Sequence, residues 1–217
     1  MSWEMEAASR SYIGILCPVR GSVSYVWCMN ARNLEIPANW AWHASSGFPI
    51  DVSRDHLVEL ALKDNVQYVF FWDTDVLVPQ NIVSQLLNLH LPIASGLYFA
   101  KSRNPCAYKK LPNGKVRPLT KEEINSAPMM EVDAVGGGCL FIDARVFKAI
   151  PKPWFKWELD PDAQEDEQIG KHSEDIYFCL KAKQHGFPTH LISAIKCKHV
   201  LETEYAIDEQ GEFTPII

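Results

Sequence analysis

Two aspartates separated by one residue follow a run of strand-forming residues near the middle of the chain. Residues 68–72, YVFFW, are aromatic or β-branched and predict a buried strand that ends at Asp73. Side chains two positions apart on such a segment project the same way, so Asp73 and Asp75 can face one ligand. Carboxylates of this kind bind hard divalent cations such as Mg²⁺ and Mn²⁺, and substrate phosphates complete the coordination. An Asp-rich turn or helix cap is the alternative interpretation.

A glycine run and a further acid occur later in the chain. No GK[ST] follows Gly136, Gly137 and Gly138, which excludes a P-loop. Residues without side chains let the backbone approach a sugar closely. Asp133, just ahead of the run, can hydrogen-bond sugar hydroxyls or close a turn.

Glu174 and Asp175 open a predicted helix whose N-cap is Ser173. The helix dipole and the free amides favour anions there, so a capping role alone explains the two acids. Trp154 and Trp157 lie next to a polar, acidic stretch, 158–173, which has no periodicity and predicts a functional lid, with disorder as the alternative. The two indoles can stack on an acceptor sugar or base, and core packing is the alternative.

The elements that must position these residues alternate between strand and helix in the first half of the chain. Expected strands are 11–19, 39–45, 68–72 and 92–100, with helices at 26–33, from Asp51 to residue 65 and from Pro79 to residue 90. Asp51 or Ser53 is the expected N-cap of the second helix. This alternation indicates an α/β protein with a parallel sheet.

The pattern changes after residue 101. Turn residues and the short segments 106–110 and 115–119 predict an antiparallel insertion. A strand, the glycine run, a second strand and a short helix follow, then a helix that ends at Gly186 and one or two strands within 189–200. A chain of 217 residues fits a single domain, 1–217, with a nucleotide-binding half at 11–100 and an acceptor-binding half at 101–217.

Composition limits the function classes. A hydrophobic content of 47% without a run long enough for a membrane span indicates a soluble protein, and the glutamate-containing N-terminus does not resemble a signal peptide, so a cytoplasmic location is expected. The net charge of −6 disfavours general nucleic-acid binding. Six cysteines without a CxxC pair disfavour a zinc ribbon, and most of them should be reduced core thiols.

As an ordered set, these motifs resemble the GT-A glycosyltransferases, closest to family 2-like enzymes, including small members found in phage genomes. The shared features are the DxD after a hydrophobic strand, the glycine run, the acidic pair at a helix start and a late histidine, His199. The resemblance implies a Rossmann-like nucleotide-diphospho-sugar transferase fold: a mostly parallel central sheet with a small antiparallel insertion. It also implies a UDP- or GDP-type sugar donor, an unidentified acceptor and Mn²⁺ or Mg²⁺.

Residue roles follow from that resemblance. Asp73, Asp75 and His199 would bind the metal, and Asp73 would also face the ribose; imidazole suits Mn²⁺ better than Mg²⁺. Asp175, with Glu174 as the substitute, would be the general base. The remaining donor and acceptor assignments are donor contacts from Pro18, Arg20, Arg54, Asp73, Asp133 and Gly137, and acceptor contacts from Trp154 and Trp157. The alternative to a donor-binding role for Arg54 is a position on the exposed surface of a helix.

Two other readings remain open at this point. A strand followed by DxD also opens the haloacid-dehalogenase-like phosphatases, with Asp73 as the nucleophile. Their motif lies on the first strand and has Thr or Val at its fifth position, whereas this chain has Leu77 there and two earlier strands. A non-catalytic nucleotide-sugar binder is the second reading, since binding and chemistry use the same site.

Overall fold

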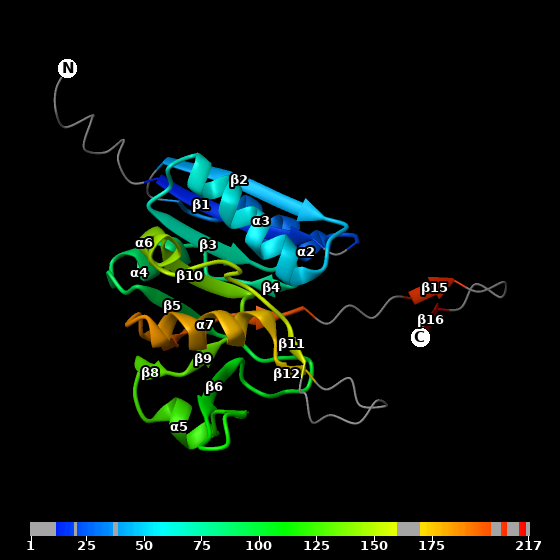
Figure 1. The fold of residues 1–217 in the computed structure, drawn as a ribbon. Coiled ribbons are helices and arrows are strands. Elements are labelled where there is room, and N and C mark those ends of the chain that lie inside the picture. Colours follow the sequence, from blue (N-terminus) through cyan, green and yellow to red (C-terminus); the bar gives the residue numbers. More distant parts are fainter. Residues whose placement is uncertain are drawn as a thin grey trace.

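A computed structural model describes residues 12–19, 21–36, 39–159, 170–200, 205–207 and 213–215. In this part of the chain seven strands form a central sheet in the order β2-β1-β3-β10-β5-β13-β8 (Figure 1). Their bounds are β2 Asn39–Ser46, β1 Tyr12–Val19, β3 Tyr68–Trp72, β10 Cys139–Asp143, β5 Ile93–Leu97, β13 Thr189–Lys196 and β8 Met130–Val132. The predicted mixed α/β sheet is therefore present.

The sheet is mostly parallel, but β10 at its centre is reversed, and the edge strand β8 is antiparallel to β13. Strands β2, β1 and β3 are parallel neighbours, and β13 is parallel to β5. Strand β10 lies between β3 and β5 and is antiparallel to both, so those two run in the same direction without pairing. The sequence did not indicate that β10 would lie between β3 and β5 in the opposite direction. Like β3, it is a short apolar run, and its direction depends on tertiary pairing.

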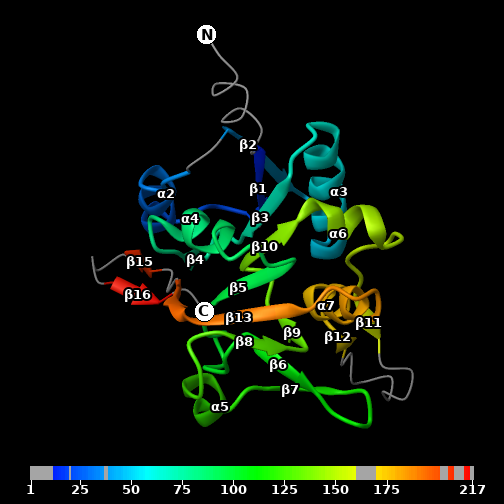
Figure 2. The ribbon, with the colours of Figure 1, turned by 90° about the vertical axis from the view of Figure 1, so that its left-hand side faces the viewer.

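Helices cover both faces of the sheet (Figure 2). Helices α2 and α4 lie on one face, and α3, α6 and α7 on the other. The helix bounds are α2 Tyr25–Arg32, α3 Ile50–Lys63, α4 Ile82–Leu87, α5 Lys121–Asn125, α6 Ala144–Ala149 and α7 Glu174–Gln184. Each face has its own hydrophobic core, one around Trp27 and Trp72, the other around Phe147 and Phe178.

Two helix starts differ from the prediction and one agrees with it. Pro49 occupies the N-cap position of α3, so the assignment of Asp51 or Ser53 was wrong. Ser53 is buried and contacts the Ser45 hydroxyl, while Asp51 lies in the first turn. Helix α4 begins at Ile82, three residues after the predicted start. Ser173 is the N-cap of α7, as predicted.

Smaller sheets surround the central one. Strands β6 (Ala107–Lys110) and β7 (Val116–Pro118) pair antiparallel and extend to β9 (Ala134–Val135), which confirms the predicted insertion. Strands β11 (Glu158–Leu159) and β12 (Gly170–His172) pair at the two ends of the predicted lid, whose residues 160–169 lie outside the described part. The remaining pairs are β4 (Val76–Leu77) with β14 (Lys198–His199) and β15 (Tyr205–Ile207) with β16 (Phe213–Pro215).

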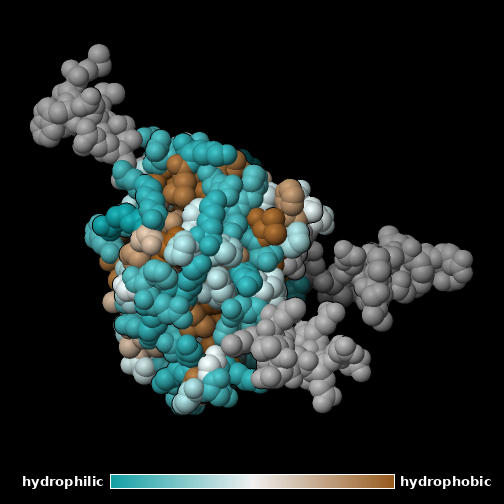
Figure 3. All heavy atoms as spheres, in the orientation of Figure 1, coloured by the Kyte–Doolittle hydropathy of each residue, from teal (hydrophilic) through white to brown (hydrophobic). Residues whose placement is uncertain are grey.

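The surface in Figure 3 is mostly hydrophilic, with separate apolar spots. Among the described helices, none combines the length and the apolar character that a membrane crossing requires. Five of the six cysteines are buried, Cys28 is exposed, and all six are free thiols, which agrees with the expected core cysteines.

Candidate functional site

The turn that carries Asp73 and Asp75 follows β3 directly and is fixed by backbone bonds. The Asp73 amide donates to the Gly138 carbonyl over 3.1 Å, and the Val76 amide donates to the Asp73 carbonyl over 3.1 Å. The indole of Trp72 donates to the Val76 carbonyl over 2.6 Å. The carboxylates therefore extend from a rigid turn at the carboxyl end of β3.

Helix α2 holds the same turn from outside, and sequence reasoning missed this support. The Trp27 indole donates to the Asp73 carbonyl over 3.1 Å. The Asn30 amide makes two bonds with Val78, donating to its carbonyl over 2.9 Å and accepting from its amide over 2.8 Å. Asn30 thus bonds to the backbone as a neighbouring strand would. A carboxamide within a helix was the only signal in the sequence, because its partner is 48 residues away.

Arg54 of α3 is buried between two carboxylates. Its side chain is only 2% exposed, and its Nη2 lies 3.0 and 3.1 Å from the two carboxylate oxygens of Asp73. Its Nε donates to Glu174 Oε1 over 3.1 Å, and its guanidinium carbon lies 5.1 Å from the centre of the Phe71 ring. Burial opposes the charge of Arg54, but Asp73 and Glu174 outweigh it and raise its pKa above the ordinary value. Arg54 is thus no surface arginine.

The pKa of the Glu174 carboxyl differs from that of an ordinary glutamate. Burial, and next the charge of Asp175, raise its pKa to about 7, although Arg54 acts in the opposite direction. Arg54, which Asp73 shares, and a backbone hydrogen bond favour the charged form. Burial outweighs both and favours the protonated form of Glu174.

The glycine run leaves space that side chains from other parts of the protein occupy. A Cβ on Gly137 would lie 2.5 Å from Arg54 Nη2, and one on Gly138 would lie 2.9 Å from the Tyr98 hydroxyl. Gly137 and Gly138 are both buried, and the Gly138 amide donates to the Tyr98 hydroxyl over 2.9 Å. The absent side chains thus leave space for Arg54 and Tyr98, and the approach of this run to a sugar stays a prediction.

Asp175 is oriented by three donors. The Gly137 amide donates to its Oδ2 over 2.9 Å, and the Ile176 amide donates to its Oδ1 over 2.8 Å. The Ser173 hydroxyl, which makes no N-cap bond, donates to the same Oδ1. These bonds fix the carboxylate beside the Arg54 cluster.

Asp75 meets His199, which the pairing of β14 with β4 brings to the turn. His199 Nε2 lies 3.0 Å from Asp75 Oδ2, and its Nδ1 lies 2.9 Å from the Phe99 carbonyl oxygen. A carbonyl only accepts, so Nδ1 carries the hydrogen and neutral Nε2 is an acceptor that faces a carboxylate. Two acceptors at this distance need a cation between them, which is a proton on Nε2 or a metal ion.

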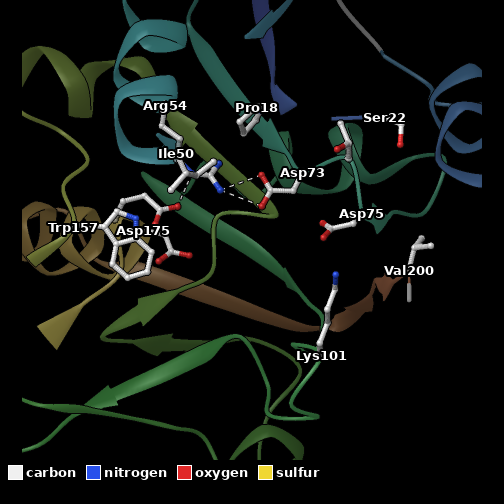
Figure 4. A pocket seen from close by; sticks show the side chains of 12 residues that line it. Pro18, Ser22, Ile50, Arg54, Asp73, Asp75, Lys101, Trp157, Asp175 and Val200 are labelled. Carbon is white, nitrogen blue, oxygen red and sulfur yellow. Dashed lines mark hydrogen bonds and ion pairs between the residues drawn. The ribbon is translucent and has the colours of Figure 1, made fainter. Parts of the chain in front are cut away.

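A pocket of about 380 Å³ collects these groups at the carboxyl ends of β1 and β3. Figure 4 shows Asp73 and Asp75 on one side, with Arg54 joined to Asp73, and Asp175 beside Trp157 on the other. The lining consists of Pro18, Ser22, Ile50, Arg54, Asp73, Thr74, Asp75, Lys101, Trp157, Glu174, Asp175 and Val200. Seven of the predicted site residues therefore share one cavity: Pro18, Arg54, Asp73, Asp75, Trp157, Glu174 and Asp175.

Other predicted residues lie elsewhere. Trp154 is 5% exposed, and its indole donates to the carbonyls of Phe147 and Ile150, so it belongs to the core. Asp133 forms an ion pair with Lys183 over 2.8 Å and does not line the pocket. His199 lines a neighbouring hollow, and Arg20 lies outside the described residues.

The described residues contain no group of three or more His, Cys, Asp or Glu that would hold a metal alone. The pair of Asp75 and His199 nevertheless fits a divalent cation, because it offers an oxygen and a nitrogen acceptor with the imidazole tautomer already fixed by Phe99. Such a cation would need oxygens from a ligand to complete its shell.

Comparison with known proteins confirms the fold. No protein-family model matches the sequence, and no curated protein shows significant similarity to it. Among solved structures, A197 from STIV aligns over 94% of this chain and 93% of its own, with a TM-score of 0.62 and 19% identity. GalNAc-T7, solved with UDP, GalNAc and Mn²⁺, aligns over 88% of this chain with a TM-score of 0.52 and 10% identity. This chain covers only 44% of the GalNAc-T7 chain. The chain thus has the fold of the GT-A glycosyltransferases, as predicted.

Proposed function

We propose that the protein is a metal-dependent glycosyltransferase, hexosyltransferase-like, which moves a sugar from a nucleotide-diphosphate sugar to an acceptor hydroxyl. The observation that carries this proposal is the pocket itself. It places the Asp73–Asp75 turn and the oriented carboxylate of Asp175 around one cavity, at the sheet edge where α/β folds bind ligands. The fold shared with GalNAc-T7, which was solved with UDP and Mn²⁺, supports the same reading.

Asp75 and His199 would hold the metal, Mn²⁺ or Mg²⁺, together with diphosphate oxygens of the donor. When bound, the metal would offset the negative charge that develops on the leaving diphosphate. Asp73 was also expected to be a metal ligand, but both of its oxygens already contact Arg54. In this proposal Asp73 serves the donor site, with Arg54 fixing its orientation.

The donor would lie along the carboxyl ends of β1 and β3, with Pro18 and Asp73 against the nucleotide. Arg54 is too deeply buried to be a freely moving phosphate ligand, since its side chain is 2% exposed. It instead neutralises two of the four carboxylates that line the cavity. The excess negative charge that remains attracts a metal-bound diphosphate rather than a free one.

Asp175 would act as the general base, because it lines the cavity and three donors fix its direction. The acceptor oxygen forms a bond to the anomeric carbon while its proton passes to Asp175. The bond from that carbon to the diphosphate oxygen breaks, and its electron pair stays with the oxygen. Trp157, which is 45% exposed at the pocket rim, would stack on the acceptor.

The phosphatase alternative would require Asp73 as an attacking nucleophile. Both Asp73 oxygens lie within 3.1 Å of Arg54 Nη2, a contact that withdraws charge from the carboxylate. This geometry favours the transferase over the phosphatase.

A thermal-shift screen of UDP, GDP, CMP and dTDP, each with and without Mn²⁺ or Mg²⁺, tests the donor site. We expect one nucleoside diphosphate to stabilise the wild type only with metal, and no such shift in Asp75→Asn. The stabilising nucleotide then identifies the nucleotide sugars for a metal-dependent hydrolysis assay without acceptor. The absence of any nucleotide-dependent shift in the wild type would refute the proposal.

A further inference from the structure

The loop that follows β5 reaches the metal-binding side of the pocket. Phe99 bridges to Pro105, the Ala100 amide donates to the Asn104 carbonyl over 2.8 Å, and the Arg103 amide donates to the Ala100 carbonyl over 2.8 Å. The loop is therefore closed on itself. The Phe99 carbonyl orients His199, so the same loop fixes the imidazole and carries Lys101 two residues later.

Three cations near this loop have no partner within the described part of the chain. The side chains of Lys101, Arg103 and Lys198 make no hydrogen bond or ion pair there, and they surround a hollow of about 340 Å³ with His199 on its wall. Elsewhere, Lys183 contacts two carboxylates, Glu131 and Asp133. In a chain with a net charge of −6, a local group of unpaired cations indicates an anionic ligand.

Lys101 connects this hollow to the main pocket, because it lines both. Figure 4 shows its side chain rising from the wall opposite Asp73, with the amine directed towards Asp75. The far side of the pocket holds Glu174 and Asp175. Of the two cationic side chains that line the cavity, Arg54 is already paired with Asp73 and Glu174, so Lys101, beside Asp75, is the one available to an anionic ligand.

We propose that Lys101, with Arg103 and Lys198 behind it, forms an anion subsite for the terminal phosphate of the donor diphosphate. This inference rests on the proposed function and deepens it. When the bond from the anomeric carbon to the diphosphate oxygen breaks, the electron pair remains on that oxygen. The Lys101 ammonium lies on the side where this charge accumulates and neutralises it without transferring a proton. An ammonium suits this task as a compact charge with rotatable donors.

The first test uses Mg²⁺-pyrophosphate, a probe that does not depend on the unidentified base. Isothermal titration calorimetry compares the wild type, Lys101→Met, Lys101→Arg and the control Lys121→Met, whose lysine is also exposed but lies on α5, outside the pocket. We expect Lys101→Met to bind pyrophosphate at least tenfold more weakly, about 1.4 kcal/mol. Lys101→Arg should retain most of the affinity, and Lys121→Met all of it.

The outcomes separate this inference from the proposed function. Equal pyrophosphate affinity in the wild type and Lys101→Met, or no binding to either, overturns the subsite. Weaker pyrophosphate binding in Lys101→Met, in a protein that binds no nucleoside diphosphate, supports an anion subsite but refutes the glycosyltransferase proposal. If nucleoside diphosphates do bind, Lys101→Met should lower the affinity for the nucleoside diphosphate. The affinity for the matching nucleoside monophosphate should stay within about twofold of the wild-type value.

Discussion

The two ends of the pocket differ in how completely the protein satisfies its own charges. At the Arg54 end, one guanidinium that is 2% exposed contacts Asp73 and Glu174, and Gly137 leaves the space for it. At the Asp75 end, the carboxylate is 46% exposed and faces a histidine acceptor. Folding alone therefore organises the first end, whereas the second end requires a ligand cation or a proton. The following substitutions separate the two ends.

The largest effect is expected at the organised end, from Arg54→Met. Removing the guanidinium leaves Asp73 and Glu174 as neighbouring buried acids, and the loss of one partner of a buried ion pair costs about 3–5 kcal/mol of folding stability. Urea unfolding measures the loss. Arg145→Met is the matched control, because Arg145 also pairs with an aspartate but its side chain is 83% exposed, so the control should unfold like the wild type. Equal stability of the two variants would show that the Arg54 cluster is not a structural unit.

Asp75→Asn, at the second end, should leave folding stability nearly unchanged and lower the catalytic activity. The exposed carboxylate contributes little to folding, so the unfolding midpoint should stay near that of the wild type. Metal-dependent turnover of the nucleotide sugar should fall by about two orders of magnitude or more, because the metal loses its charged ligand. Initial rates at saturating donor measure this loss.

The chain contains a matched control for this substitution. His43 and Asp64 form a second His–Asp pair, with Nε2 2.9 Å from Oδ2 and similar exposure, 18% and 40%, but it lies outside the pocket. Asp64→Asn should leave turnover unchanged. If both variants lost activity equally, the effect of Asp75→Asn would reflect general damage rather than metal binding.

The same contrast separates what the sequence predicted from what it missed. The buried strand before Asp73 is visible in five consecutive aromatic or β-branched residues, and the acids at the start of α7 follow from helix-start patterns. These signals are local. The antiparallel direction of β10 and the bonds from Asn30 to Val78 depend on pairing between distant segments, which no local pattern encodes. Asp133 is the converse case, since it precedes the glycine run in the sequence but pairs with Lys183 and does not line the pocket.

Asn30→Ala tests whether the metal-binding end depends on support from α2. Without the two bonds to Val78, the segment after Asp75 loses a fixed partner, so the carboxylate should be less well positioned for the metal. We expect a several-fold higher metal concentration for half-maximal activity, with turnover near the wild-type value at saturating metal. Asn33→Ala, at the end of the same helix, should change neither quantity. A loss of turnover that added metal does not restore would contradict a positioning role.

The last prediction concerns the pH dependence that Glu174 contributes to stability. Burial raises its pKa to about 7 in the folded protein, whereas an unfolded glutamate titrates near about 4.3. Between these values the folded state holds a proton that the unfolded state has released. The stability of the wild type relative to Glu174→Gln should therefore rise as the pH falls from 7 towards 4.3, by at most about 1.4 kcal/mol per pH unit, and level off outside that window.

Urea unfolding of the wild type and Glu174→Gln at pH 5, 6, 7 and 8 measures this difference. Glu59→Gln is the control, because a hydrogen bond from Lys152 lowers the pKa of Glu59, so its contribution should stay constant over this pH range and be lost only below the ordinary pKa of a glutamate. A Glu174 contribution that also declined at low pH would mean that Arg54 dominates over burial and keeps this carboxylate ionised. The organised end of the pocket would then carry one more negative charge near pH 6, and its electrostatic contrast with the Lys101 end would be larger than the raised pKa implies.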